Sequence, residues 1–384
     1  MSTSSFRSGN FFAAAMLFTA IAAYSAFAPA FSDTACASKA FAQASSAAVQ
    51  TATTAVSQRG QEGKGADQTP GARNEDRTFT RDRFKFETMT MSDGLPSNYV
   101  TSIAGAPDGS VYFGTWGGVV KYDGQMMRPI GETGRVEGII PKNISSLYID
   151  GEGTLWIGTL FYENAGLFRY RNGQFERFTQ LDGMPSNNVT CISGSSDEIF
   201  IGTWGGGLAV YDGKGFSVKN KAAGLSDDFI TSIDFDDNSK SLWVATKFNG
   251  ANLIRGGRIE IMDDHTSSLV NNNVHKVLVD PNQNYTYFGT SGGISRYNGA
   301  TWQNIIKGPG SIGNNFICSF FLYRSILYFI TGDGMSILSE GNWSNISFDS
   351  ASGFHQAQLN AIYVDERFIY IGTDRGLYKI GRRN

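Results

Sequence analysis

The sequence predicts an all-β protein, a seven-bladed β-propeller built from four-stranded antiparallel blades. Three observations lead to this fold. Glycine accounts for 46 of the 384 residues and aromatic residues for 13%, a composition typical of short strands joined by tight turns. An aromatic-rich pattern that ends in threonine returns seven times, at intervals of 41 to 44 residues. Each interval holds four strand candidates, which is the strand content of one propeller blade.

The N-terminus has the order of a secretory signal peptide, which we assign to residues 1–30. An uncharged apolar run from Phe11 to Ala28 follows a short segment with one arginine and no acidic residue. Cleavage after Ala30 or Ala42 avoids a proline directly behind the cut. The protein is therefore expected to be exported, to the periplasm or the extracellular space. An uncleaved membrane anchor and lipidation at Cys36 are the alternatives.

Residues 31–82 form a second zone of distinct composition. Ala, Ser, Thr and Gln dominate as far as Val56, and mixed charges with glycine and proline follow. Such a segment has too little apolar surface to offset the entropy cost of ordering it. We predict a disordered linker here and assign the propeller to residues 83–384.

The repeated pattern is a strand that ends in a small residue followed by threonine, and we call it the marker strand. Its copies read VYFGT, LWIGT, IFIGT, LWVAT, TYFGT, LYFIT and IYIGT, and they end at Thr115, Thr159, Thr203, Thr246, Thr290, Thr331 and Thr373. The sixth copy departs from the pattern because Ile330 stands where glycine is usual. The even spacing predicts one blade for each copy.

Three further strands surround each marker strand. An inner strand precedes it, as in NYVTSI from Asn98, and a tight turn joins the two. A third strand follows and closes with an Asn-Gly or Asp-Gly turn, the pair that favours two-residue hairpins. A fourth strand, such as QFERFT from Gln174, ends in an exit loop such as DGMPSN from Asp182. The exit loop leads to the next inner strand.

The last repeat has a third strand, GLYKIG from Gly376, and no fourth strand behind it. At the other end, FKFETM from Phe84 has the pattern of a fourth strand and leads into the exit loop DGLPSN. We therefore expect the N-terminal strand to complete the seventh blade and close the ring. Closure removes an exposed sheet edge that would otherwise promote aggregation.

Charge and residue counts exclude several classes of protein. The chain has 32 basic and 35 acidic residues, which argues against a nucleic-acid partner. Its histidines, His265, His275 and His355, lack the spacing of metal ligands. No metal, cofactor or catalytic residue is predicted. Cys191 and Cys318 fall on inner strands at opposite sides of the ring, so both are predicted to be buried free thiols.

The phrases VTSIAGAPDGSVYFGTWGGVVKYDG and VTCISGSSDEIFIGTWGGGLAVYDG, together with the DGLPSN and DGMPSN loops, resemble two-component regulator propeller repeats. The resemblance covers about 300 residues. It implies an exported, sensor-type propeller, often with carbohydrate-linked input. Because no kinase sequence accompanies the repeats, it implies recognition without a kinase activity of the chain's own.

Two sets of loop residues share one end of the predicted ring. One set follows the marker strands, and the other lies just ahead of the inner strands. Indole faces can stack on sugar rings while amides and carboxylates exchange hydrogen bonds with hydroxyl groups, so these residues are candidates for ligand binding. They are Asn98, Trp116, Asn187, Trp204, Asp228, Lys247, Asn272, Asn315, Asp374 and Arg375. The alternatives are that the Asn and Asp side chains cap their own loops and that the indoles pack on a neighbouring blade.

The leading functional interpretation is an exported binding module. Its partner would be a small molecule, a glycan or an envelope protein, and only an uncleaved N-terminal anchor would contact a membrane. Two alternatives stay open. One is a propeller enzyme of the lyase or glycan-processing type, for which only His275 would lie near the ring centre. The other is an envelope scaffold.

Overall fold

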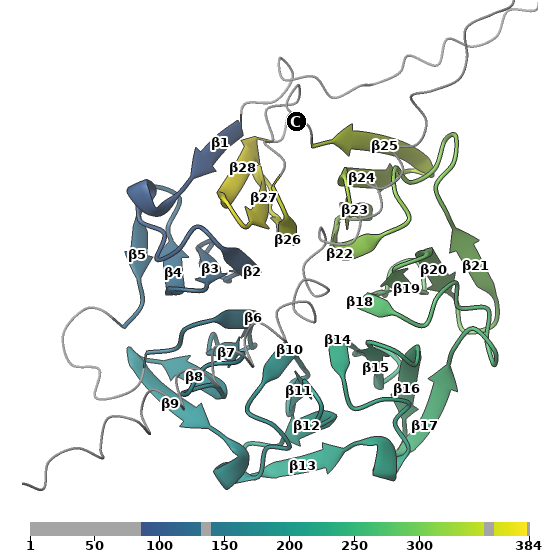
Figure 1. Cartoon of the computed structure of the whole chain (residues 1–384), viewed down its shortest axis with the longest axis horizontal. Helices are drawn as coiled ribbons and strands as arrows, with labels where there is room; N and C mark the ends of the chain where they lie inside the picture. The colour runs from purple at the N-terminus through teal and green to yellow at the C-terminus, as the bar shows by residue number, and fades with distance from the viewer. Residues whose placement is uncertain (1–85, 132–139, 349–356, 382–384) are drawn as a thin grey trace, which may run out of the picture. The chain divides into compact units, whose positions relative to one another are not determined.

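Seven four-stranded antiparallel sheets are arranged around a central axis in the computed structural model, as Figure 1 shows. The structure describes residues 86–131, 140–348 and 357–381, all within one compact unit of the chain. The predicted seven-bladed propeller is confirmed. The predicted signal peptide and linker lie outside the described residues. Within these ranges, no helix has the length and hydropathy needed to span a membrane.

The blades are numbered by their inner strands. Blade one comprises β2 (Val100–Gly105), β3 (Val111–Thr115), β4 (Gly118–Tyr122) and β5 (Met127–Pro129), and blade two β6 (Ile144–Ile149), β7 (Leu155–Thr159), β8 (Leu167–Arg171) and β9 (Gln174–Phe178). Blade three comprises β10 (Val189–Gly194), β11 (Ile199–Thr203), β12 (Leu208–Tyr211) and β13 (Phe216–Lys219), and blade four β14 (Ile230–Asp236), β15 (Ser241–Thr246), β16 (Ala251–Arg255) and β17 (Arg258–Met262).

Blade five comprises β18 (Val274–Asp280), β19 (Tyr285–Thr290), β20 (Gly293–Tyr297) and β21 (Trp302–Ile305), and blade six β22 (Ile317–Tyr323), β23 (Ile326–Thr331), β24 (Gly334–Ser339) and β25 (Asn342–Ser347). Blade seven comprises β26 (Leu359–Val364), β27 (Phe368–Thr373), β28 (Gly376–Gly381) and β1 (Phe86–Met89). Three exit loops contain short 3-10 helices, η2 (Met91–Asp93), η3 (Gln180–Asp182) and η4 (Lys221–Ala223).

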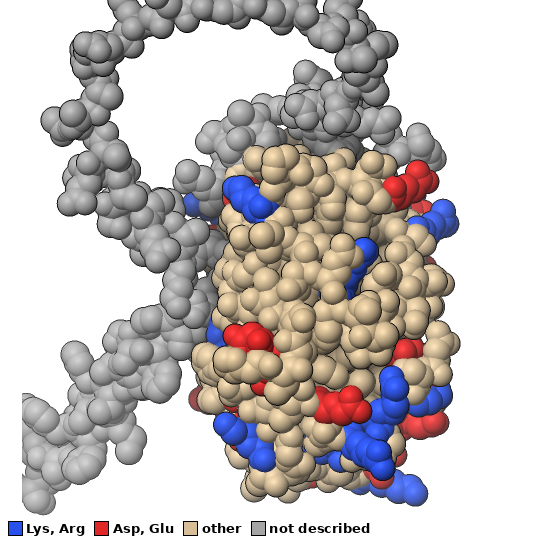
Figure 2. Space-filling view, turned by 90° about the vertical axis from the view of Figure 1, so that its right-hand side faces the viewer, with Lys and Arg blue, Asp and Glu red and all other residues tan. Residues whose placement is uncertain are grey.

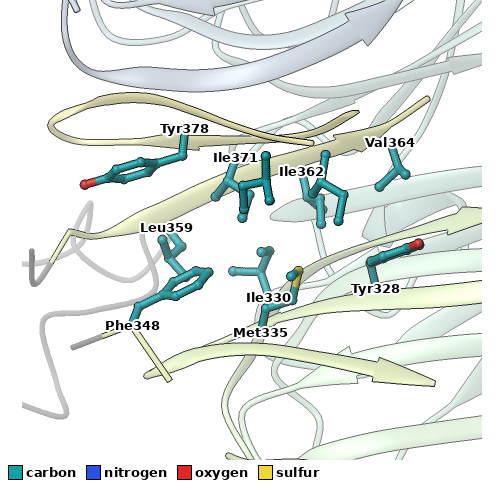
Figure 3. Close-up of a cluster of buried hydrophobic side chains, with 11 residues drawn as sticks. Tyr328, Ile330, Met335, Phe348, Leu359, Ile362, Val364, Ile371 and Tyr378 are labelled. Atoms are coloured by element: carbon teal, nitrogen blue, oxygen red, sulfur yellow. The ribbon is translucent and has the colours of Figure 1, made fainter. Parts of the chain in front are cut away.

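The apolar core is divided among the blade interfaces. Each of seven buried clusters joins two neighbouring blades. Figure 3 shows the cluster between blades six and seven, where Ile330 and Met335 face Leu359 and Ile371. Because a four-stranded sheet cannot bury both of its faces alone, the ring of blades is the unit that holds the core.

The buried threonine of each marker strand ties that strand to the third strand. In six blades its hydroxyl donates a hydrogen bond to a glycine carbonyl at or next to the start of the third strand, over 2.7–2.9 Å. In blade six the hydroxyl of Thr331 donates instead to the carboxylate of Asp333. A bond repeated in six of the seven blades explains why threonine ends the pattern.

The marker glycine lets the next blade approach closely. A Cβ atom on Gly202 would lie 2.4 Å from Cys191 Sγ and 2.6 Å from Ile230 Cγ2, both of which are closer than real Cβ contacts. Blade six departs from this packing, because Ile330 is fully buried in the same cluster as Leu359. Blade six therefore places its own side chain in the space that a side chain of the next blade, such as Ile230, occupies beside the marker glycines.

The N-terminal strand closes the ring, as predicted. Strand β1 pairs antiparallel with β28, with Glu87 opposite Lys379. Lys379 is only 8% exposed, and its Nζ donates to Tyr122 Oη of blade one over 3.0 Å and lies 3.4 Å from Glu87 Oε2. On the inner side, Asn360 Nδ2 of blade seven donates to the carbonyl of Val100 over 2.9 Å.

Inner strands are joined to the next blade by side-chain hydrogen bonds. The hydroxyls of Thr101, Ser145 and Thr231 each donate to a carbonyl of the following inner strand over 2.6 Å. Between blades four and five, Asp234 Oδ2 also accepts a hydrogen bond from the backbone N–H of Val279 over 2.7 Å. The interface of blades four and five therefore includes a carboxylate.

Burial raises the pKa of Asp234 to about 6, and nearby Asp236 adds to this, although hydrogen bonds from Val279 and Phe235 act the other way. A native pKa above the unfolded value means that the folded state binds the proton more tightly. Lowering the pH from 7 to 4.5 should therefore add about 1–2 kcal/mol to the free energy of unfolding. This value is below the free energy that corresponds to the whole pKa shift, because the side chain of Asp234 is only half-buried. Urea unfolding at both pH values measures this gain, and Asp234→Asn should reduce it. An identical pH dependence in the variant would contradict the assignment.

One of the two predicted free thiols is confirmed. Cys191 is a free cysteine, and burial raises the pKa of its thiol to about 11. Cys318 is disulfide-bonded, so the prediction of a free thiol there was wrong. The sequence argument considered only a bond between Cys191 and Cys318, which lie on the inner strands of blades three and six.

Candidate functional site

One end of the ring, here called the loop face, is formed by the residues after the marker strands and those ahead of the inner strands. Backbone hydrogen bonds join the two sets in all seven blades. In each of the following pairs the backbone N–H of the first residue donates to the carbonyl of the second: Trp116 and Tyr99, Leu160 and Asn143, Trp204 and Asn188, Lys247 and Phe229, Ser291 and Asn273, Gly332 and Phe316, and Asp374 and Gln358. The loop face therefore has a backbone fixed by its own strands, and the side chains that it presents vary from blade to blade.

Five of the predicted site residues share one structural role. In each, a side-chain oxygen accepts a hydrogen bond from a backbone N–H of the exit loop ahead of it, over 2.6–2.9 Å; they are Asn98, Asn187, Asp228, Asn272 and Asn315. These bonds favour the interpretation that the side chains cap their own loops. Contact with a ligand stays a prediction for them.

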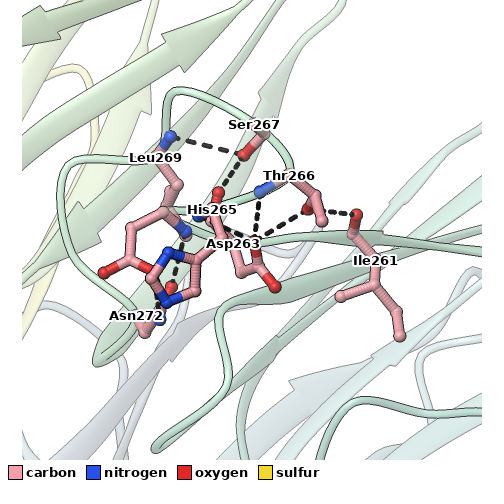
Figure 4. A network of polar contacts seen from close by, with 8 residues as sticks. Ile261, Asp263, His265, Thr266, Ser267, Leu269 and Asn272 are labelled. Carbon is pink, nitrogen blue, oxygen red and sulfur yellow. Dashed lines mark hydrogen bonds and ion pairs between the residues drawn. The ribbon is translucent and has the colours of Figure 1, made fainter.

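Figure 4 shows this arrangement in the exit loop of blade four. Asn272 accepts from the backbone of Asp264 and returns a bond from Nδ2 to its carboxylate, over 2.9 and 2.7 Å. Asp263 Oδ1 accepts from the backbone N–H groups of His265 and Thr266. His265 is exposed at the tip and lies 3.5 Å from Asp264. The loop is thus held by local bonds, and among the described residues its histidine belongs to no group that could hold a metal ion.

Trp116 is the most exposed of the tryptophans predicted for the site. Its indole stacks on the ring of Tyr99, with centroids 4.0 Å apart and planes 14° apart, and 47% of the residue is still exposed. Burial and the charge of Asp374 raise the pKa of Tyr99, so this carboxylate is near enough to act on the tyrosine. Asp374 itself accepts a hydrogen bond from the backbone of Gln358. An aromatic platform with an acidic group at its side lies where blades seven and one meet.

A second group of rings, the aromatic row, crosses blades two to four. Phe161, Trp204, Phe229 and Phe248 follow one another with ring centroids 6.5, 5.0 and 5.7 Å apart. Phe161 is 37% exposed and Phe248 56% exposed. Exposed apolar surface of this kind marks interaction sites more often than isolated surface residues do.

Phe161 adopts an unusual backbone conformation, with a φ of +47°. A bulky residue in the left-handed region is uncommon and carries a conformational cost. The backbone N–H of Phe161 donates to Asn188 Oδ1 of blade three over 2.8 Å, which holds the ring at the surface next to Trp204. The strained residue therefore lies in the loop that presents an exposed aromatic side chain.

The sequence identified Trp116 and Trp204 but missed Tyr99, Phe161, Phe229 and Phe248. The missed residues occupy the same repeat positions, in the loop after the marker strand or just ahead of the inner strand. Aligning every repeat on its threonine would have shown aromatic residues at these positions. Of the remaining predictions, Lys247 is buried with 3% exposure, whereas Arg375 is exposed.

Histidine and metal chemistry have little support among the described residues. His275 Nε2 lies 2.8 Å from Ser291 Oγ, and its ring packs against Phe316. His355 lies outside the described residues. In the part of the chain that the structure describes, no group of three or more His, Cys, Asp or Glu side chains could hold a metal ion. A lyase-type activity stays a hypothesis.

Comparison with known proteins identifies the repeat. Residues 94–117 and 138–161 match the two component regulator propeller family. The chain is 22% identical to the extracellular domain of a protein described as a hybrid two component system from B. thetaiotaomicron, with a TM-score of 0.65. The match covers 77% of this chain and 42% of that domain. A one component system domain from B. thetaiotaomicron is 20% identical, with a TM-score of 0.61 and the same coverage.

The fold is also that of a lyase. Virginiamycin B lyase from Staphylococcus aureus is 14% identical, with a TM-score of 0.60, over 78% of this chain and all of that one. The present chain spans less than half the length of the two extracellular domains. No curated protein matches the sequence. At these identities, the structural matches show the propeller fold, and the repeat family rests on the sequence match.

Proposed function

We propose that this chain, a propeller that carries two component regulator propeller repeats, is an exported, sensor-like recognition module that binds a small polyhydroxylated molecule or glycan on its loop face. The likeness to extracellular domains of two component systems supports a sensor-like role outside the cytoplasm. The observation that carries the proposal is the aromatic row together with the Tyr99–Trp116 stack. Of these rings, Trp116, Phe161 and Phe248 are exposed, on a face whose backbone is already fixed.

Aromatic faces suit the apolar faces of sugar rings, because a ring that is already packed on one side loses little conformational freedom when it stacks. Polar groups at the edges would then supply hydrogen bonds to hydroxyl groups. Asp374 lies beside the Tyr99–Trp116 pair, and Arg375 is exposed next to it. A concave or partly enclosed site usually combines an apolar wall with a few such polar groups.

Substitution of the exposed rings tests this proposal. Trp116→Ala, Trp204→Ala and Phe248→Ala should each weaken binding of a glycan selected on the wild-type protein by roughly 1–3 kcal/mol, the scale of lost aromatic stacking. Isothermal titration calorimetry measures the affinity. Ile261→Ala is a matched control, because Ile261 is 42% exposed on the outer strand β17.

The melting temperature distinguishes the alternatives. For Trp116 and Phe248 it should change little, since both are already exposed. A loss of many degrees in all three variants would identify the rings as blade packing. Unchanged affinity in all three would place the ligand elsewhere. The enzyme and scaffold alternatives rest on less, namely the contact of His275 with Ser291 and the shared propeller fold.

A further inference from the structure

A groove of about 440 Å³ lies between blades five and six, and we call it the lateral groove. The turns that border it join β18 to β19, β22 to β23 and β24 to β25, so it belongs to the end of the ring opposite the loop face. Its apolar wall consists of Ile305, Leu327, Leu338 and Trp343, and its charged side chains are Arg296 and Glu340. The volume falls within the range of about 300–1,000 Å³ that is typical of small-molecule sites.

The blades on either side of the groove are poor in charge. From Tyr285 to Phe348 the chain has five charged residues among 64, whereas the whole chain is 17% charged. Figure 2 shows this side of the ring, with an extended uncharged surface and a basic side chain set among uncharged atoms. Each charge in the groove therefore has few neighbours that could neutralise it.

Arg296 differs from its counterpart in blade two. Arg169 occupies the same position in its third strand and faces Glu176 on the fourth strand, with which it forms an ion pair. Arg296 faces Gln303 instead, and its Nε donates to the amide oxygen over 2.8 Å. Its guanidinium lies 4.6 Å from the ring centroid of Tyr285 and forms no ion pair with any described residue. Blade five thus keeps the arginine and lacks the carboxylate.

A second observation lies behind Arg296. Tyr287 is fully buried, and burial raises the pKa of its hydroxyl, while a hydrogen bond from Arg296 and the charge of Arg296 lower it. The aromatic rings of Tyr285 and Tyr287 therefore hold the guanidinium of Arg296 in place without neutralising its charge.

Glu340 occupies a position that normally suits glycine or asparagine. Its φ is +51°, and the corresponding turn residues of blades two and four are Asn172 at +53° and Gly256 at +54°. The side chain is exposed and forms no ion pair with any described residue, while the carbonyl accepts a hydrogen bond from Asn342. A glutamate is uncommon in this conformation, and here it stands at the rim of the groove.

We propose that the lateral groove binds a short peptide with apolar side chains. Its carboxylate would pair with Arg296, its ammonium group with Glu340, and its side chains would pack on Leu327, Leu338 and Trp343. A zwitterion accounts for both unpaired charges of opposite sign, which a neutral sugar or a simple anion does not. Arginine is well suited to the carboxylate because its planar guanidinium can donate two parallel hydrogen bonds.

The dipeptide leucyl-leucine is the probe, with binding measured by isothermal titration calorimetry on the full chain. Its C-terminal amide should bind at least about tenfold more weakly, and its N-acetyl form about fivefold more weakly, because each modification removes one charge. Arg296→Gln should reproduce the first effect and Glu340→Gln the second. Arg169→Gln is the matched control and should leave binding unchanged.

Gln303→Glu is the sharpest variant. It rebuilds in blade five the arginine–glutamate pair of blade two, so the fold should be kept while affinity for the dipeptide falls at least about tenfold. Full binding to Gln303→Glu, or no binding of the dipeptide to the wild-type protein, would overturn the proposal. Binding of maltose that depends on the same residues would also overturn it, in favour of a polyhydroxylated ligand. None of these results depends on the loop face.

Discussion

A chain that starts at Asn98 is expected to lose most of its stability or to aggregate, whereas one that starts at Thr78 should melt like the protein that carries residues 31–384. The reason is that the first of these truncations removes β1. Blade seven would then present β28 as an open edge, which can template association between chains. The hydrogen-bonded ladder to β28 and the contact of Glu87 with Lys379 would also be lost.

Differential scanning calorimetry and light scattering on the two truncated chains measure this effect. The buried ammonium group of Lys379 would keep Tyr122 as a neighbour but lose its only carboxylate among the described residues. Because Glu87 is half-exposed, this pair contributes at most about 1 kcal/mol, and most of the loss comes from the ladder to β28 and from Phe86 and Met89, which pack on apolar clusters. Equal melting temperatures for the two chains would show that the ring closes without β1.

Gly202→Val should lower the free energy of unfolding by about 3 kcal/mol or more. The new Cβ would enter space held by Cys191 Sγ and by the side chain of Ile230 on the next blade. Neither neighbour can withdraw easily, since both belong to inner strands that are packed between blades. Urea unfolding with a linear extrapolation gives the change.

Gly215→Ala is the control for that substitution. Gly215 has no neighbour within 4 Å of an added Cβ and no left-handed φ, so the change should lie within about 0.5 kcal/mol of zero. A Gly202→Val variant as stable as this control would mean that neighbouring blades adjust freely. The marker glycine would then reflect turn formation instead of blade packing.

Much of the fold could be predicted because every blade repeats the same backbone requirements. The threonine at Thr203 and the glycine before it are needed for a turn and for close approach of the next blade, and both needs recur at a fixed spacing. Closure by the N-terminal strand followed from the missing fourth strand of the last repeat. The spacing of the repeats along the sequence was therefore enough to predict the strands, the turns and the loop face.

Side-chain partners were less accessible to prediction, because they come from other blades or depend on one local change. The role of Asn98 as a loop cap needed the position of a backbone N–H seven residues away. The surface position of Phe161 depends on a hydrogen bond from blade three. The unpaired charge of Arg296 becomes visible only when Gln303 is compared with its counterpart in blade two.

The pairing of β1 with β28 also sets the order in which the chain can fold. Glu87 and Lys379 are 292 residues apart, so the first strand of the propeller to be synthesised is the last to find its partner. Contacts of such sequence separation slow folding and prolong the exposure of unpaired edges. Early blades can form on the growing chain, but the interface between blades seven and one must wait until synthesis is almost complete. A folding helper that protects β1 during this interval should raise the yield of native protein more than one that acts on any internal blade.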